Sequence, residues 1–385
     1  MVLLIISFST FAVGFIARPL GGLIFGHFGD RVGRKRTLVV ALMMMGAATT
    51  LIGLLPTYAA IGVAAPLILV LLRFVQGLAI GGQWGGAMLL VTENAPADQR
   101  GWYGAYAQAG APVGVILANL AFIGVSSSMS EEAFMDWGWR LPFIASIVLI
   151  GISMYVQLRL EDTEAFKALQ ESQDGEASDQ PIAASPVVEA IRKYPKRIML
   201  AAGAFLSVQV TFYILIAFII AYGVTAPELA LSRDTMLTAV LIAAAIMVPS
   251  QFYFSGLSDR VGRKQIYRWG AILTGLWGFA LFPLINTGEP LMIVIAVTLG
   301  LTFLGMQYGP QAAYFTELFT TEVRYSGASL GYQIGAILGG ALAPTIAVLL
   351  WNELGIFYVS VYILVAAILT LLSLSALEET KGRTL

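Results

Sequence analysis

Asp30-Arg-Val-Gly-Arg-Lys35 and Asp259-Arg-Val-Gly-Arg-Lys264 are two copies of one basic hexapeptide, and they lie 229 residues apart. Each copy follows one long apolar run and precedes another. This arrangement is typical of a short turn between two membrane spans. A basic turn repeated once has an alternative explanation: its Lys and Arg residues would then serve only to set the membrane topology of the neighbouring spans.

A second pair of matches repeats at nearly the same offset. Thr92-Glu93 with Arg100 and Thr316-Glu317 with Arg324 lie 224 residues apart, each at the end of an apolar run. Two matches in the same order predict an internal duplication into two homologous halves, as in many secondary transporters.

The composition indicates a membrane protein. Hydrophobic residues make up 58% of the chain, charged residues make up 12%, and the mean hydropathy is +0.81. Without Cys and with one His, the chain has no disulfide and no evident metal site, and we expect no cofactor. The net charge of −1 and the lack of an extended basic tract argue against nucleic acid as a partner.

Apolar runs long enough to cross a bilayer core of roughly 30 Å occur eleven times along the chain. We expect an all-α polytopic protein with spans near residues 1–25, 37–55, 66–91, 103–125, 141–160, 197–222, 236–256, 266–285, 290–315, 327–350 and 356–377. Glycines recur every four residues at Gly77, Gly81 and Gly85, and again from Gly327 to Gly339. Such stripes predict close helix packing.

The distribution of Lys and Arg predicts the orientation. If the hexapeptide turns are cytoplasmic, that side carries 18 of the 22 basic residues, whereas the other side has Arg140 and Arg233. Arg18 and Arg73 lie within spans. By the positive-inside rule, the C-terminus is then cytoplasmic.

The two predicted halves are unequal. We expect an N-terminal half over residues 1–160 with five spans, a cytoplasmic linker over 161–196, and a C-terminal half over 197–385 with six spans. Two spans precede the second hexapeptide within its half, but one precedes the first. The expectation is therefore eleven spans of a twelve-span protein, with a further apolar span encoded upstream of Met1.

Several longer motifs resemble the major facilitator superfamily and, within it, the metabolite:proton symporter family. They are Phe11-Ala-Val-Gly-Phe-Ile-Ala-Arg-Pro-Leu-Gly-Gly22 before the first hexapeptide, Arg73-x2-Gln76-Gly77, Gly81-Gly-Gln-Trp-Gly-Gly86, Trp137-Gly-Trp-Arg-Leu-Pro-Phe143 and Phe319-Thr-Thr-Glu-Val-Arg-Tyr-Ser-Gly327. The resemblance covers nearly the whole chain. It implies two helical-bundle halves in the cytoplasmic (inner) membrane, and symport of a small metabolite with protons, of shikimate, alpha-ketoglutarate or proline-betaine type.

Two departures from the family bear on proton coupling. The family's first helix, which carries acidic residues, has no counterpart here, and Gln83 stands where relatives have Glu. No acidic residue therefore falls in the middle of a predicted span. Proton coupling needs a titratable group in the pathway.

Two arginines within spans are the leading candidates for substrate contact. Arg18 and Arg73 each offer a planar fork that matches a carboxylate, and no mid-span acid is at hand to pair with them. The alternative is that they are structural. Neutral polar and aromatic residues in spans complete the predicted substrate-binding set: Gln83, Trp84, Gln108, Asn119, Gln209, Tyr213, Gln307, Tyr332 and Gln333. For any one of these, helix–helix hydrogen bonding is the alternative.

The charged turns predict a cytoplasmic gate. A carboxylate at a span end can meet a helix N-terminus or a nearby Arg, and Glu93/Arg100 and Glu317/Arg324 are expected to add two partly solvated pairs. The predicted gate residues are Asp30, Arg31, Gly33, Arg34, Lys35, Glu93, Arg100, Asp259, Arg260, Gly262, Arg263, Lys264, Glu317 and Arg324.

The sequence therefore favours a monomeric secondary active transporter that moves a small organic acid by alternating access, with proton symport implied by the resemblance. A zwitterionic osmolyte such as proline or betaine is the alternative substrate, since its cation can face aromatic rings. Another class is a non-transporting membrane receptor, or a truncated, poorly active product. A membrane enzyme would need a His, Cys or acidic cluster at depth, which the sequence lacks.

Overall fold

The structure is a computed structural model that describes residues 12–25, 34–159, 191–319 and 324–383. These residues form helices and no strands. Up to residue 159 the helices are Ala12–Phe25, α2 (Arg34–Leu54), α3 (Tyr58–Ile61), α4 (Ala64–Glu93), α5 (Arg100–Gln108), α6 (Gly110–Ser127), α7 (Glu131–Asp136), η1 (Gly138–Arg140), α8 (Leu141–Ile144) and α9 (Ile147–Arg159). From residue 195 they are α12 (Pro195–Tyr213), η2 (Ile214–Phe218), α13 (Ile219–Thr225), α14 (Arg233–Val261), α15 (Arg263–Ile285), α16 (Pro290–Glu317), α17 (Arg324–Gly335), η3 (Ala336–Ala341), α18 (Ala343–Leu354) and α19 (Phe357–Ala376).

Ten helical stretches within the described residues are long and apolar enough to cross a membrane. The helix Ala12–Phe25 is shorter, because the structure describes the span expected over residues 1–25 only from residue 12 onward. Several short elements join into single spans, such as α12, η2 and α13 over Pro195–Thr225. The expectation of an all-α polytopic protein is confirmed.

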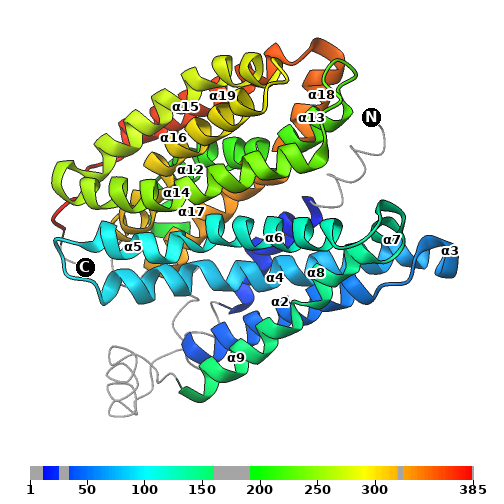
Figure 1. The fold of residues 1–385 in the computed structure, drawn as a ribbon. Coiled ribbons are helices and arrows are strands. Elements are labelled where there is room, and N and C mark those ends of the chain that lie inside the picture. Colours follow the sequence, from blue (N-terminus) through cyan, green and yellow to red (C-terminus); the bar gives the residue numbers. More distant parts are fainter. Residues whose placement is uncertain (1–11, 26–33, 160–190, 320–323, 384–385) are drawn as a thin grey trace.

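The helices lie in two side-by-side groups (Figure 1). In one, α2 packs on α4, α8 and α9; in the other, α16 packs on α14 and α15, and α19 packs on α12 and α15. Helices α5 and α6 join the groups by packing on α14, and α5 also packs on α16. We call the end where α14 meets α15, at Asp259 to Lys264, the hexapeptide end, and the other the opposite end.

Glycines allow the helices to touch backbone to backbone, as their spacing predicts. A Cβ atom on Gly77 would overlap the backbone of Gly14, and one on Gly81 would overlap the backbone of Arg18. Helix α4 therefore lies directly against Ala12–Phe25. On α17, Gly335 meets α12 in the same way.

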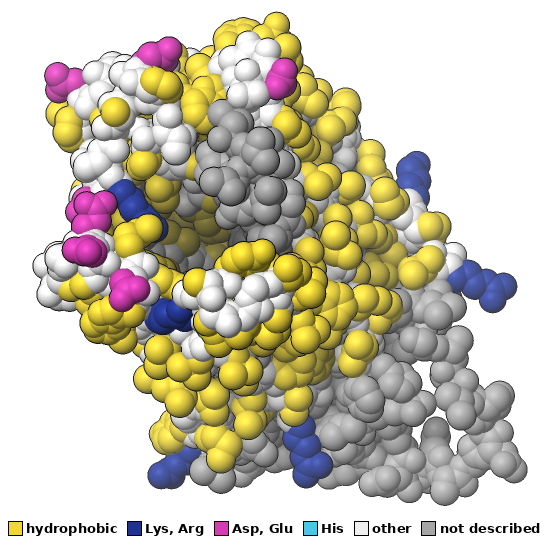
Figure 2. Space-filling view, turned by 90° about the vertical axis from the view of Figure 1, so that its right-hand side faces the viewer, with side chains coloured by type: hydrophobic (Ala, Val, Ile, Leu, Met, Phe, Trp, Pro, Cys, Tyr) yellow, Lys and Arg dark blue, Asp and Glu magenta, His cyan; other side chains and the backbone are white. Residues whose placement is uncertain are grey.

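The sides of the molecule are apolar. Leu67, Tyr253, Leu276 and Leu372 are each more than 60% exposed. In Figure 2, which views the molecule from the opposite end, hydrophobic side chains cover much of the described surface. A water-soluble protein rarely leaves so many large apolar side chains exposed, whereas a membrane-spanning surface requires them.

Candidate functional site

Arg18 is a buried cation without a charged partner in the described part of the chain. Arg18 is 8% exposed, and its guanidinium carbon lies 3.7 Å from the centroid of the Phe15 ring. Its Nε atom is buried without a hydrogen-bond partner. A charge at membrane depth is costly unless a cavity or a counter-ion offsets it. Arg18 is therefore a candidate for binding an anionic group, to which its guanidinium would donate hydrogen bonds.

Aromatic rings from both helix groups surround the region of Arg18. Trp84 of α4 stacks on Tyr332 of α17 with ring centroids 4.0 Å apart, and Tyr332 lies 4.3 Å from Phe205 of α12. Phe15 meets Tyr213 edge to face at 5.2 Å. We call this set, with Arg18, the aromatic cluster. The predicted residues Arg18, Trp84, Tyr213 and Tyr332 thus share one region.

Unpartnered polar atoms accompany the aromatic cluster. The indole Nε1 of Trp84, the amide Nε2 of Gln83 and the Oε1 of Gln333 are buried without a hydrogen-bond partner. The Nε2 of Gln333 donates a long 3.5 Å bond to the carbonyl of Gly81. Gln209 lies within hydrogen-bonding reach of Tyr332. Because buried polar groups are normally paired, donors and acceptors left open here suit a polar ligand.

Two π-helical segments adjoin the aromatic cluster. Tyr213 immediately precedes η2, and Gly340 lies within η3. A Cβ atom on Gly340 would lie 2.6 Å from Phe15, 2.9 Å from Tyr213 and 3.2 Å from Gln209. Such π-segments interrupt regular helix bonding and occur frequently at functional sites.

Arg73 has protein partners and lies elsewhere. Its NH1 donates to Gln76 at 3.2 Å, and Gln76 donates to Thr49 of α2 at 2.7 Å. Arg18 lies beside Gly81 on α4, eight residues or about 12 Å of helix beyond Arg73. The two arginines, which look alike in the sequence, thus have different surroundings.

The other predicted polar residues lie on separate contacts. Gln307 donates to Thr274 at 2.8 Å, which is a helix–helix bond between α16 and α15. Gln108 of α5 donates to the carbonyl of Tyr308 at 2.9 Å and so joins the two helix groups. Asn119 is buried on α6, which packs on α14.

Asp259 ties the two helix groups together at the hexapeptide end. Its Oδ1 accepts from the backbone N–H of Gly101 at 2.8 Å, and its Oδ2 accepts from that of Trp102 at 2.9 Å. These are first-turn amides of α5, whose N-cap residue Gln99 supplies no side-chain bond. Asp259 therefore caps α5 from the other group, where the helix dipole favours a negative charge.

Gly101 permits this close approach. A Cβ atom there would lie 2.5 Å from Arg263, 2.6 Å from the carbonyl of Ser255 and 2.9 Å from Asp259. Any larger residue would push α5 away from α14.

Arg263 connects Asp259 to a second carboxylate. It forms ion pairs with Asp259 and, at 3.2 Å, with Glu317 of α16. The side chains of Arg263 and Glu317 are each 1% exposed. Glu317 also accepts from the hydroxyl of Thr380 at 2.6 Å. The expectation that Glu317 belongs to a partly solvated pair is therefore wrong: it is a buried partner of Arg263, which α15 brings beside it.

The segment after α19, residues 377–383, folds across the hexapeptide end, and we call it the tail segment. The carboxylate of Glu379 accepts from the backbone N–H groups of Arg263 and Lys264, at 2.9 and 3.0 Å, and so caps α15. Gly262, whose φ of +121° favours glycine, lies against Glu379. Arg100 donates to the carbonyl of Arg383 at 2.6 Å, which links the tail segment to α5.

The remaining predicted gate residues are only partly described. Asp30, Arg31 and Gly33 lie outside the described residues, and so do the side chains of Arg34, Lys35, Glu93 and Arg324. Lys264 donates to the carbonyl of Leu377, and the carbonyl of Arg260 accepts from Lys381. In these contacts both residues face the tail segment.

The opposite end holds a cleft between the helix groups. It has a volume of about 420 Å³ and is lined by Phe122, Glu131 and Phe134 on one side and by Arg233, Asp234 and Leu237 on the other. Figure 2 looks onto this end and shows acidic and basic side chains around a hollow.

Sequence reasoning missed three contributors to the hexapeptide end. Gly101 and Trp102 act through backbone N–H groups, which carry no signal in side-chain type. The acidic pair Glu378-Glu379 after the last span was the available signal for the tail segment.

Taken together, the paired helix groups, the cluster around a buried cation, the bonded end and the cleft at the other end define a polytopic α-helical transporter. The Major Facilitator Superfamily model matches residues 4–330. The chain belongs to this superfamily, whose members are membrane transporters and not enzymes.

Curated relatives and solved structures agree with this assignment. The chain is 41% identical over 388 residues to the inner membrane metabolite transport protein YhjE of Escherichia coli K12, covering 98% of this chain and 85% of the relative. It is 37% identical over 359 residues to a shikimate transporter of the same strain, covering 91% and 80%, and 31% identical over 390 residues to a proline/betaine transporter of Salmonella typhimurium, covering 99% and 76%. The proton:xylose symporter XylE is similar in fold, with a TM-score of 0.75 at 17% identity over 97% of this chain and 86% of that one.

Proposed function

We propose that this protein is a secondary active transporter of the inner membrane that moves a small organic acid carboxylate by alternating access, with proton symport. The single observation that carries the substrate class is Arg18, a buried cation with no acidic partner in the described residues and an open Nε atom. A substrate carboxylate would supply the missing negative charge.

The two moving parts in this proposal are residues 1–160 and 197–385, joined by a linker over 161–196. The aromatic cluster contains side chains from both parts, so a ligand there would contact both. The positive-inside rule places the hexapeptide end and the C-terminus in the cytoplasm. On that orientation, the bonds at the hexapeptide end and the cleft at the other end support an outward-facing state.

The proposal of proton symport rests mainly on family membership, because no carboxylate lies beside Arg18 among the described residues. Within the described spans, Asp259 and Glu317 are buried carboxylates at the hexapeptide end, not beside Arg18. We infer that any coupling acid among these residues acts on closure of that end. Uptake measured with and without an imposed proton gradient tests this part separately.

A zwitterionic osmolyte is the second candidate substrate, and the aromatic rings favour it. Trp84 and Tyr332 lie near Arg18 but stack on each other at 4.0 Å, so a quaternary or secondary ammonium would reach their facing π-surfaces only by separating the pair. A betaine carboxylate would still meet Arg18. One relative is named a shikimate transporter and another is named a proline/betaine transporter. Both substrate classes therefore occur in the names of relatives.

The test is uptake by purified protein in proteoliposomes, with labelled organic acids, betaines and their amide analogues. Arg18→Gln should weaken carboxylate uptake by roughly 30-fold or more, because a buried charge-assisted contact is lost, and it should affect amide analogues much less. Arg73→Gln is the matched control, since Arg73 already bonds to Gln76. Equal losses for carboxylate and amide in Arg18→Gln would make Arg18 structural.

A further inference from the structure

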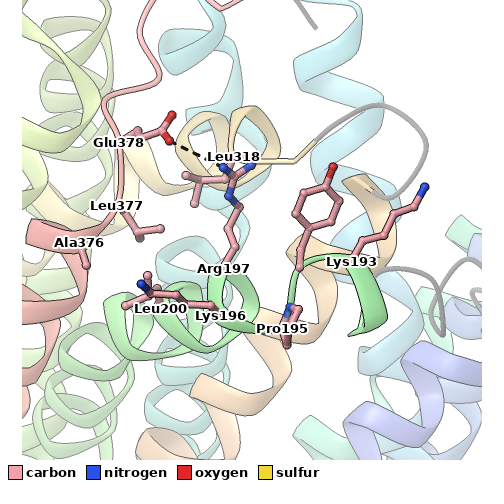
Figure 3. A pocket seen from close by; sticks show the side chains of 10 residues that line it. Lys193, Pro195, Lys196, Arg197, Leu200, Leu318, Ala376, Leu377 and Glu378 are labelled. Atoms are coloured by element: carbon pink, nitrogen blue, oxygen red, sulfur yellow. Dashed lines mark hydrogen bonds and ion pairs between the residues drawn. The ribbon is translucent and has the colours of Figure 1, made fainter.

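A basic pocket lies at the hexapeptide end, outside the aromatic cluster. It has a volume of about 260 Å³ and opens where the chain enters α12, facing the ends of α16 and α19. Lys193, Lys196 and Arg197 line it together with one acidic residue, Glu378. Figure 3 shows Arg197 extending from the first turn of α12 toward Leu318 and Glu378. Lys196 and Arg197 alone therefore outnumber the one carboxylate of the lining.

The one acidic residue of the lining forms a long ion pair with Arg197 and offsets its charge only in part. The NH2 of Arg197 lies 3.8 Å from Oε1 of Glu378, which is too long for a hydrogen bond. Glu378 instead forms its short ion pair with Arg383 through Oε2. Arg197 uses NH1 to donate to the carbonyl of Leu318 at 2.8 Å. That bond fixes the guanidinium in place, and NH2, whose contact with Glu378 is an ion pair longer than a hydrogen bond, can still donate to a further acceptor.

The rest of the lining is apolar. Leu200, Leu318, Ala376 and Leu377 form this wall beside the cations. Leu200 and Ala376 belong to membrane spans, so the pocket lies where the spans of α12 and α19 reach the membrane surface. Cations next to an apolar wall at this level match a phosphate group that carries a glycerol and acyl chains.

We propose that this pocket binds the phosphate group of an anionic phospholipid. The NH2 of Arg197 donates to the phosphate oxygens in place of its long contact with Glu378, Lys196 adds a second positive charge, and the acyl chains follow the apolar wall. Since Leu377 and Glu378 belong to the tail segment, the bound lipid lies beside the segment that caps α15.

Lipid retention in native mass spectrometry tests this proposal on the purified full-length chain. Phosphatidylglycerol is the probe, phosphatidylcholine is the zwitterionic comparison, and glycerophosphate is the soluble phosphate. Lys196→Gln/Arg197→Gln should lower phosphatidylglycerol affinity by about tenfold or more. The control is Arg159→Gln, an exposed cation at the end of α9 away from the pocket. Its affinity should equal that of the unchanged chain.

A conservative variant guards against misfolding. Arg197→Lys retains the charge and should keep most of the affinity, while uptake by each variant reports that the fold is intact. Equal phosphatidylglycerol binding by the double variant and the unchanged chain would overturn the proposal. Competition by glycerophosphate as strong as by the lipid would overturn the assignment to a lipid.

Discussion

The two ends of the molecule differ in how the helix groups meet. At the hexapeptide end, Asp259 accepts two backbone N–H bonds from α5, and Arg263 and Glu317 are almost fully buried beneath it. At the opposite end, charged side chains such as Glu131 and Arg233 line an open cleft. One end is therefore held by specific bonds, while the other is open.

We propose that this difference sets the balance between the two states of the transporter. In this proposal, closure of the hexapeptide end depends on a few bonds between the helix groups, each worth about 1–3 kcal/mol when a charge is involved. That is small against the packing within each group but large for an equilibrium between two states. Weakening these bonds should shift the state while leaving each helix group folded.

The largest effect is expected from Gly101→Leu. A side chain there would collide with Arg263 and the Ser255 carbonyl and would keep α5 away from α14. Uptake in proteoliposomes should fall by more than about tenfold, because closure of the hexapeptide end is blocked. Gly124→Leu is the control, since a Cβ at Gly124 has nothing within 4 Å. Normal uptake by Gly101→Leu would show that this contact is not needed.

Asp259→Asn should have the next largest effect. It removes the negative charge that caps α5 and pairs with Arg263, and leaves Arg263 with one buried carboxylate partner. The open state should gain about fivefold to a hundredfold in population.

The rate of maleimide labelling at a single introduced cysteine can report opening of the hexapeptide end, because the chain has no native Cys. Ser255 is 0% exposed, so Ser255→Cys should be labelled only when this end opens. Asp259→Asn should raise that rate, whereas the exposed Asp98→Asn should not. An unchanged labelling rate would mean that Asp259 does not hold this end closed and that the hexapeptide only sets the membrane topology.

A smaller effect should follow from Thr380→Val. This change removes the hydroxyl that donates to Glu317 while keeping the side-chain shape. Loss of one buried hydrogen bond should raise labelling of Ser255→Cys by about fivefold. Thr287→Val, at an exposed turn of the opposite end, is the control. Equal labelling in both variants would mean that the tail segment does not support closure.

The smallest effect is expected from Glu131→Gln at the cleft. Glu131 lies at the solvated rim of the opposite end, where a single charge contributes little. Uptake should change by less than about twofold. A loss as large as that of Asp259→Asn would show that the opposite end is also held by a specific charge.

The sequence predicted the spans, the glycine contacts and the acid at the end of α14. Those features have local signals in the sequence: the length of the apolar runs, glycines that recur every four residues, and an acid before a Gly-containing turn. The partners of Asp259 had no such signal, because they are backbone N–H groups 157 and 158 residues away. Arg18 and Arg73 look alike in the sequence, and the fold separates them: Arg73 bonds to Gln76 three residues along the same helix, whereas Arg18 has no acidic partner among the described residues and a buried, unpartnered Nε atom.

Distances between spin labels at both ends would test the central claim most directly. One pair, Asp98→Cys with Gln265→Cys, spans the hexapeptide end, and another, Glu132→Cys with Glu228→Cys, spans the opposite end; all four residues are exposed. Asp259→Asn should lengthen the first distance and shorten the second in the same sample. If Asp259→Asn leaves both distances unchanged, the bonds at the hexapeptide end do not control the state of the transporter.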